Sequence, residues 1–172
     1  VGFSALTWST NTMPIIQLGL VPVILDCEPN TLNTMSYNLL ERLEQTSLQA
    51  LFITNILGFT GDIATIRSIC EEKNIVLIED NCESLGTVLP EGKAGNFGIG
   101  ASFSFFVAHH MSTIEGGMVC TSDDEFAEVL KRFVNACERM TADQWFWAPP
   151  GVVEGGQPQG VRPPQPLFCR IG

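Results

Sequence analysis

Short runs of apolar, β-branched residues alternate along the chain with amphipathic stretches. The runs at residues 21–26, 50–54 and 75–79 are apolar nearly throughout, and this composition is typical of strands buried on both faces of a sheet. Two further apolar runs predict strands at residues 101–105 and 118–121. These runs therefore predict at least five strands of one sheet.

The stretches between these runs repeat their apolar positions at the spacing of an α-helix. Helices are predicted over four stretches: residues 9–18, 35–44, 62–73 and about 123–134. Asp62 is the expected cap of the third helix, and Ser122 or Asp123 caps the fourth. Because strands and helices alternate strictly, the sequence predicts an α/β fold with three αβα layers and a mostly parallel sheet.

The two ends of the chain depart from this pattern. The chain begins at Val1 inside a strand-like run, without an initiator methionine, so we expect a fragment; the family resemblance described below implies that this fragment is inactive by itself. Residues 148–172 hold six of the ten prolines and five of the 16 glycines, and such a composition forms no packed element. We therefore expect one α/β domain over residues 1–147 and an unstructured tail over residues 148–172.

Composition and charge narrow the possible functions. Apolar residues make up 45% of the chain and charged residues 16%, which is typical of a globular core and not of a disordered chain. Acidic residues outnumber basic ones by 19 to 9, a net charge of −10, so the surface would repel nucleic-acid phosphates. No apolar run approaches the roughly 20 residues that cross a bilayer. We expect neither nucleic acid nor a membrane as a partner.

The cysteines are scattered along the chain, with no C-x-x-C pair among them. There are six: Cys27, Cys70, Cys82, Cys120, Cys137 and Cys169. This spacing disfavours a disulfide scaffold or a zinc finger and indicates reduced thiols, as in the cytoplasm.

Both histidines of the chain stand side by side in a polar loop after an apolar strand. His109 and His110 lie in the stretch SFSFFVAHHMSTIEGG, residues 102–117, at the strand end where open α/β sheets bind ligands. One interpretation is a surface histidine beside a packed one. A metal site is disfavoured, because adjacent side chains diverge and no matching His or Cys cluster stands nearby.

Two other features also follow predicted strands. Glu79 and Asp80 end a buried strand, where a carboxylate is costly unless a positive group meets it. They are either loop or capping carboxylates or partners of a cationic ligand group. Trp8 follows the first strand and is either a packing residue or a flat face for an aromatic cofactor ring.

Taken together, these motifs resemble one enzyme family. Trp8 in its loop, E-D-N-C-E-S after a strand, and S-F-x-x-x-H-H-x-S-T-x-E-G-G appear in this order. In that order and spacing they resemble the nucleotide-sugar aminotransferase family of pyridoxal-phosphate enzymes (fold type I). The resemblance covers about residues 1–134 and implies that the chain is the central part of the cofactor-binding large domain.

The chain departs from that family at one position. In the family's aminotransferases, a lysine that binds the cofactor covalently stands where this chain has His109. The three lysines of this chain, Lys73, Lys93 and Lys131, lie outside the motif. A histidine there marks the 3-dehydratase branch of the family. The resemblance therefore implies a lyase that uses pyridoxal or pyridoxamine phosphate to remove the 3-hydroxyl of a nucleotide-linked 4-keto-6-deoxyhexose.

The resemblance also assigns roles to single residues. His109 is the acid/base, because an imidazole can take and return a proton near neutral pH; His110 should point away. Asp80 matches the partner of the cofactor's pyridinium nitrogen, and Glu83 matches a residue beside the ring hydroxyl. The other cofactor-binding positions are the ring-stacking Trp8 and the phosphate-binding Ser104. Asn55 is expected to line the same pocket.

One branch of the family carries an iron–sulfur cluster on four cysteines and works with a reductase. Cys82 matches the first of those cysteines, but the expected C-x-C is replaced by Trp145, Phe146 and Trp147. Cys82, Cys137 and Cys169 do not have the spacing of a four-cysteine cluster. We therefore expect no metal and favour the type that acts on GDP-linked sugars.

The family resemblance implies further partners and leaves two alternatives open. It implies a nucleotide-sugar substrate, glutamate as amino donor and a homodimer, in a cytoplasmic pathway of deoxysugar synthesis for O-antigen, lipopolysaccharide or related glycans. One alternative is a nucleotide-sugar aminotransferase, against which the missing lysine argues. The other is a non-catalytic, degenerate relative. A dinucleotide-binding protein is disfavoured because the chain lacks Gly-x-Gly-x-x-Gly after a strand.

Overall fold

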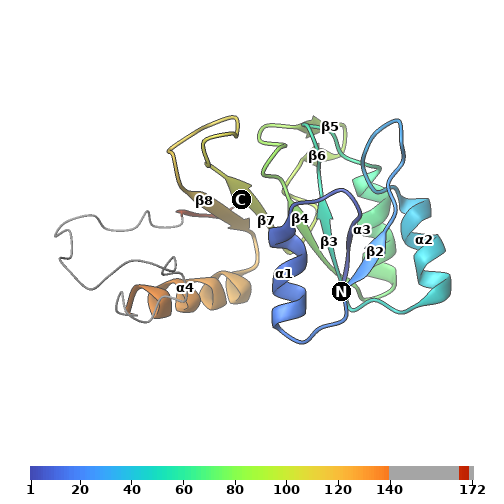
Figure 1. Ribbon diagram of the computed structural model, residues 1–172, viewed down its shortest axis with the longest axis horizontal. Helices are drawn as coiled ribbons and strands as arrows, with labels where there is room; N and C mark the ends of the chain where they lie inside the picture. The colour runs from blue at the N-terminus through green and yellow to red at the C-terminus, as the bar shows by residue number, and fades with distance from the viewer. Residues whose placement is uncertain (140–166, 171–172) are drawn as a thin grey trace, which may run out of the picture.

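The computed structural model describes residues 1–139 and 167–170 (Figure 1). Strands and helices alternate from residue 2 to residue 80, and four strands then follow one another before the last helix. In order, the elements are β1 (Gly2–Ser4), α1 (Ser9–Gln17), β2 (Val23–Leu25), α2 (Ser36–Gln45), β3 (Ala50–Thr54), α3 (Ile63–Glu72), β4 (Val76–Asp80), β5 (Val88–Leu89), β6 (Gly92–Lys93), β7 (Gly100–Ser104), β8 (Gly117–Thr121), α4 (Asp124–Arg139) and β9 (Leu167–Arg170).

A seven-stranded sheet in the order β2-β1-β3-β4-β7-β8-β9 forms the middle layer. The first five of these strands run parallel to one another, β8 is antiparallel to β7, and β9 is parallel to β8. β5 and β6 form a separate antiparallel pair. The predicted α/β fold with a mostly parallel sheet is confirmed. The order of connection reverses at β1, and ligands of open α/β sheets bind at the carboxyl ends of strands beside such a reversal.

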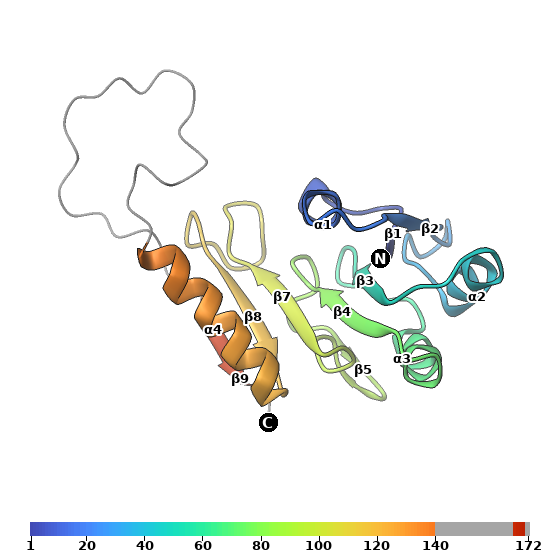
Figure 2. The ribbon, with the colours of Figure 1, turned by 90° about the horizontal axis from the view of Figure 1, so that it is seen from below.

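Helices cover both faces of the sheet (Figure 2). α2 and α3 pack on one face, and α1 lies on the other. α4 packs on the α1 face over β7 and β8, where Phe126 lies so close to Gly100 that a Cβ there would be 2.7 Å from its ring. The three αβα layers are those expected from the sequence.

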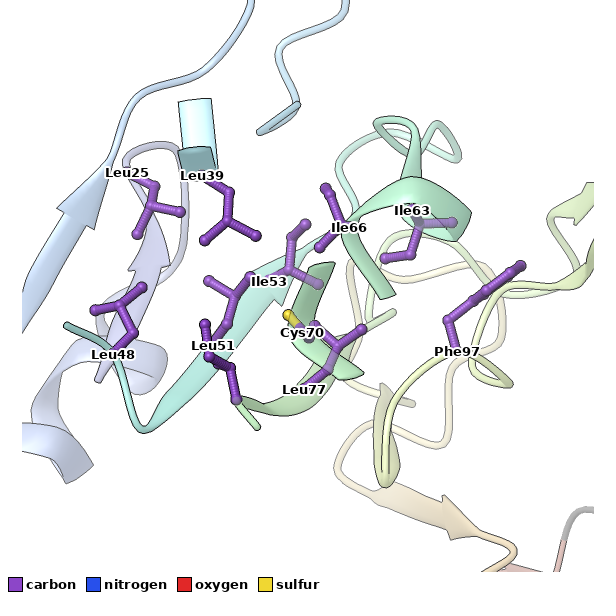
Figure 3. Packing of buried hydrophobic residues seen from close by; sticks show 11 residues of the cluster. Leu25, Leu39, Leu48, Leu51, Ile53, Ile63, Ile66, Cys70, Leu77 and Phe97 are labelled. Atoms are coloured by element: carbon purple, nitrogen blue, oxygen red, sulfur yellow. The ribbon is translucent and has the colours of Figure 1, made fainter. Parts of the chain in front are cut away.

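The main core lies between the sheet and the helices α2 and α3 (Figure 3). Its buried members come from β2, β3, β4, both helices and the loops beside them: Leu25, Leu39, Leu48, Leu51, Ile53, Ile63, Ile66, Cys70, Ile75, Leu77 and Phe97. A smaller cluster of Ala101, Phe103 and Cys120 continues on the same face beneath β7 and β8. Alternate residues of β3 and β4 thus enter this core, and the residues between them face α1.

The structure corrects two details of the predicted elements and decides a third. Residues 21–26 were expected to be buried on both faces, but β2 is an edge strand in which Ile24 is 54% exposed. Asp62 takes the N-cap position of α3, as expected, but its side chain makes no capping bond. Its carboxylate instead accepts bonds from the N–H and hydroxyl of Ser36 at the start of α2. The fourth helix is capped by Asp123, whose Oδ1 accepts the N–H of Phe126 at 2.7 Å.

The segment predicted to be an unstructured tail also holds one strand. Leu167–Arg170 form β9, which pairs in parallel with Met118 to Thr121 of β8. The expectation of no packed element is therefore wrong at these four residues, because backbone pairing to a sheet edge needs no favourable composition. The other residues of 148–172 lie outside the described residues, and so does Cys137's side chain. None of the helices in the described ranges is long and apolar enough to span a bilayer.

Candidate functional site

The predicted site residues follow strands whose carboxyl ends meet at one edge of the sheet. Trp8 follows β1, Asp80 ends β4 and Glu83 follows it, and Ser104 ends β7 with His109 in the loop beyond. Because β1, β3, β4 and β7 are parallel, all these positions lie at the same edge, which is the upper edge in Figure 1. The structure therefore brings the five predicted residues to one end of the fold.

The alternation along β4 sends its two terminal carboxylates to opposite faces of the sheet. Glu79 follows the parity of Leu77 and enters the side of α2 and α3, whereas Asp80 faces α1. In register with Asp80 are Thr54 of β3 and Ser102 of β7. The α1 face of the sheet therefore ends in a row of polar side chains with a carboxylate in its middle.

Asp80 is 5% exposed and is held by three hydrogen-bond donors. Its Oδ2 accepts from Asn11 Nδ2 at 2.6 Å; its Oδ1 accepts from the backbone N–H of Cys82 at 3.1 Å and from the Ser102 hydroxyl at 3.3 Å. None of the ion pairs within the described ranges includes Asp80. The carboxylate is thus fixed in orientation by neutral donors, and a cationic ligand group would be its charge partner.

Sequence reasoning missed the polar cluster behind Asp80. Asn11 Nδ2 also lies 2.8 Å from Thr7 Oγ1 and 3.0 Å from Thr54 Oγ1, and the two hydroxyl oxygens are 2.6 Å apart. Asn11 is 5% exposed and stands one helical turn before the buried Ile15. That i, i+4 spacing of an amide on the apolar side of a predicted helix was the available signal.

Glu79 is fully buried and meets no cation within the described residues; backbone amides meet it instead. Its oxygens accept the N–H groups of Gly95, Phe97 and Gly98 at 2.8 to 2.9 Å, and two side-chain amides approach to 3.4 Å. A charge so completely surrounded by donors stabilises the 95–98 loop. Glu79 is therefore a structural carboxylate, as one of the two alternatives for this pair expected.

Asn55 belongs to the Glu79 network and does not line the Asp80 side. Its Nδ2 donates to Asn81 Oδ1 at 2.6 Å, and its side chain is fully buried. Its Oδ1 has no hydrogen-bond partner in the described structure. Within the described residues Asn55 thus contacts the Glu79 network, and its expected place in a cofactor pocket stays a prediction.

Glu83 connects two loops at the site edge. Its Oε2 accepts the N–H of Leu57 at 3.1 Å, so the loop after β4 holds the loop after β3. Leu57 adopts a φ of 56°, and the Thr87 hydroxyl donates to the carbonyl of Gly58 at 2.8 Å. Glu83 is half-buried, with one carboxylate oxygen engaged by this bond. Both loops are therefore braced where a ligand would approach.

Cys82 is a poor nucleophile in this environment. Burial, and then the negative charge of Asp80, raise the pKa of its thiol from 9.0 to about 12. The thiol is therefore neutral near pH 7 and contributes to the site through its backbone N–H. No three or more His, Cys, Asp or Glu side chains in the described ranges are placed to hold a metal ion.

The loop after β7 carries both histidines and is closed at its base. The Phe105 N–H donates to the Gly116 carbonyl at 2.9 Å, and the Ser104 hydroxyl accepts the N–H of Phe106 at 3.2 Å. His109 is half-buried and His110 exposed, so the two side chains have different surroundings as expected. No lysine lies in this loop: Lys73 follows α3, Lys93 ends β6, and Lys131 pairs with Glu128 in α4.

Trp8 is open to solvent at the same edge. It precedes α1, makes no side-chain capping bond and is 73% exposed. A tryptophan with so much free ring surface is available for stacking. Among the described residues Trp8 is therefore not a core-packing residue, and its stacking role stays a prediction.

Comparison with known proteins gives a consistent result. The DegT/DnrJ/EryC1/StrS aminotransferase family model matches residues 1–152. GDP-4-keto-6-deoxy-D-mannose 3-dehydratase of Escherichia coli O55:H7 is 38% identical over 126 residues, which make up 73% of this chain and 32% of that protein. The same enzyme from Yersinia pseudotuberculosis is also 38% identical over 126 residues, again 73% of this chain and 32% of that protein. The chain thus spans about a third of the length of these curated relatives.

Solved structures of this enzyme are also similar to the chain. A histidine-to-asparagine variant of GDP-4-keto-6-deoxymannose-3-dehydratase with bound GDP-perosamine gives a TM-score of 0.67 at 34% identity, covering 75% of this chain and 33% of that one. The same enzyme with a trapped PLP-glutamate geminal diamine gives 0.66 at 33% identity, over 76% and 33%. The family expected from the motifs is confirmed: this chain belongs to the DegT/DnrJ/EryC1/StrS aminotransferase family.

Proposed function

We propose that this chain forms the central part of a lyase that uses pyridoxal or pyridoxamine phosphate to remove the 3-hydroxyl of a nucleotide-linked 4-keto-6-deoxyhexose. The observation that carries the proposal is His109, at the Asp80 edge of the sheet, in a loop without any lysine. An aminotransferase needs a lysine amine there to bind its cofactor covalently. A histidine at this position cannot form that covalent bond, but it can act as an acid and a base.

The residues present fit such a cofactor. Asp80 offers a buried carboxylate, fixed by neutral donors, for a pyridinium nitrogen. Trp8 offers an exposed ring for stacking, and Ser104 ends β7 where a phosphate would lie. Glu83 would lie beside the hydroxyl group of the cofactor ring. When bound, the cofactor supplies an amine for the keto group and a ring that accepts electrons.

His109 does the proton transfers in this mechanism. One imidazole nitrogen of His109 would take the proton that the cofactor's methylene carbon gives up. The resulting imidazolium would donate a proton to the departing 3-hydroxyl oxygen, which leaves as water. Asp80 would pair with the pyridinium nitrogen of the bound cofactor. The backbone hydrogen bond from Phe105 to Gly116 fixes the two ends of the loop that carries His109.

The partners follow from the relatives. We propose a GDP-linked sugar as substrate, because the 38%-identical relatives are GDP-4-keto-6-deoxy-D-mannose 3-dehydratases. Glutamate is the proposed amino donor, since a related enzyme was trapped with a PLP-glutamate adduct. A homodimer, a cytoplasmic location and a role in lipopolysaccharide sugar synthesis complete the proposal; a relative 35% identical is the lipopolysaccharide biosynthesis protein RfbH of Salmonella typhimurium.

The test uses the full-length protein with pyridoxamine phosphate and GDP-4-keto-6-deoxymannose. The expected product is a 3-deoxy ketosugar, and His109→Asn should lose about 100-fold or more of that activity. His110→Asn is the matched control and should retain it. An aminosugar product would identify an aminotransferase. A protein that does not change the absorbance of added cofactor would be a non-catalytic relative.

A further inference from the structure

A buried amide on α1 joins the groups that surround Asp80. Asn11 Nδ2 lies 2.6 Å from Asp80 Oδ2, 2.8 Å from Thr7 Oγ1 and 3.0 Å from Thr54 Oγ1. An amide nitrogen carries two hydrogens. One therefore points at the carboxylate, and the other is shared by the two hydroxyl oxygens, which lie 2.6 Å from each other.

The same residue is tied to Trp8 through the backbone. The Asn11 N–H donates to the Trp8 carbonyl at 3.0 Å in the first turn of α1. The Trp8 side chain itself makes no capping bond and is 73% exposed, so its placement depends on the start of this helix. Asn11 thus connects three elements: the helix that presents the ring, the end of β3 and the end of β4.

The two oxygens of Asp80 are held in different ways. Oδ1 is bonded from its own side by the Cys82 N–H at 3.1 Å and by the Ser102 hydroxyl at 3.3 Å. Oδ2 has Asn11 as its one donor within the described residues. Rotation of the carboxylate is therefore prevented only while both sets of bonds exist, and Asn11 is the part of the set that comes from α1.

We propose that Asn11 is a positioning residue, which fixes the Asp80 carboxylate and the Trp8 ring relative to each other so that one flat, cationic ring can engage both at once. This inference rests on the proposed function, because that function supplies the ring. Holding a group in a productive orientation is worth more than the bond energy alone. Asn11 acts through Asp80 and Trp8 and touches neither the reacting atoms nor the proton path.

The experiment measures binding of pyridoxamine phosphate to the full-length protein by absorbance, across a range of pH. Asn11→Ala removes the donor and should weaken binding about tenfold or more, as expected for a lost bond to a charged group. Asn38→Ala is the matched control: Asn38 is also buried and hydrogen-bonded, to the Met35 N–H at 2.9 Å, but lies on α2 across the sheet. That variant should bind as the wild type does.

The Asn11→Asp variant tests the pH dependence of cofactor binding, a quantity that a purely structural role of Asn11 would not change. Two carboxylates in contact share a proton, so binding to Asn11→Asp should depend on pH around neutrality, whereas binding to Asn11→Ala should not show that extra dependence. Unchanged affinity and spectra in Asn11→Ala, or an equal loss in Asn38→Ala, would overturn the inference while leaving the proposed function intact. A wild-type protein that does not bind pyridoxamine phosphate would overturn both.

Discussion

Two adjacent carboxylates at the end of β4 have opposite surroundings. Glu79 is enclosed on the α2 and α3 side by three backbone N–H groups and two side-chain amides. Asp80, on the α1 side, is bonded by two side chains and one backbone N–H. Backbone donors from one loop indicate a carboxylate that stabilises the fold. Side-chain donors from α1 and β7 fix the orientation of Asp80, which is what the proposed role as a ligand partner requires.

The largest expected effect is on stability, from Glu79→Gln. The amide would point its own N–H groups at donors that now bind a carboxylate oxygen, so the free energy of unfolding should fall by about 3 kcal/mol or more. Denaturant unfolding of the full-length protein measures it. Glu83→Gln, where one bond to the Leu57 N–H is at stake, is the control and should cost less than about 1 kcal/mol. Equal losses would contradict the distinction between Glu79 and its neighbours.

Asp80→Asn should affect cofactor binding more than stability. It removes the charge that would pair with a pyridinium nitrogen but keeps an acceptor oxygen for the Cys82 N–H. The affinity for pyridoxamine phosphate should fall about 100-fold. The free energy of unfolding should fall by about 1–2 kcal/mol, less than in Glu79→Gln, because only the Asn11 amide would then face a donor. Titration followed by absorbance, together with thermal unfolding, separates the two quantities. A variant that unfolds easily yet binds normally would reverse the roles given to the two carboxylates.

A smaller effect should follow from loosening the loop that encloses Glu79. A Cβ added at Gly98 would lie 2.6 Å from the Leu77 carbonyl oxygen, so Gly98→Ala must displace the loop. We expect a loss of about 1–3 kcal/mol and faster hydrogen exchange at the amides of Phe97 and Gly98. Gly19→Ala is the control, because Gly19 has a positive φ of 69° but nothing within 4 Å of its added Cβ. Exchange near Glu79 should be unchanged in that variant.

The smallest expected effect near neutral pH comes from the Cys82 thiol, and it grows only at alkaline pH. The pKa of the Cys82 thiol is raised to about 12 by burial and then by Asp80. Above the unfolded thiol's pKa, the unfolded state loses its proton while the folded state keeps it, so stability should fall as the pH rises from 9 toward 12. Cys82→Ala should flatten this fall by at most about 1.4 kcal/mol per pH unit.

Asp80→Asn provides a second check on that thiol. Without the neighbouring charge, the Cys82 pKa should be lower, and alkylation by iodoacetamide should begin at a lower pH than in the wild type. Identical alkylation profiles would show that burial alone sets the pKa of the thiol.

Local patterns in the sequence predicted most of the fold. Residues 50–54 form β3 with the predicted bounds, and the four helices appear within a few residues of their expected places, except that α4 extends to Arg139. The patterns were less informative at edges: the two-residue strands β5 and β6 are too short to show a period, and β9 depends on a partner far along the chain.

The site shows the same limit. Motif spacing predicted Asp80 and Trp8 as site residues, but the role proposed for Asn11 depends on α1 crossing the end of β4, a contact across 69 positions. The fate of Asp62 was missed for a similar reason, because its bond to Ser36 spans 26 positions. Residue identity can indicate that a polar side chain will be satisfied, but only the packed structure determines by which partner.

The antiparallel turn between β7 and β8 has a consequence for how such a protein can change. The chain leaves the sheet after Ser104 and re-enters it beside the same strand at Gly117, so the segment that carries His109 begins and ends on one pair of hydrogen-bonded neighbours. Its length and composition can therefore vary without altering the register of any other strand. Replacing an imidazole by an amine in this loop would therefore leave the strand pairing of the sheet unchanged. A lineage can in this way alternate between two chemistries while its architecture stays the same.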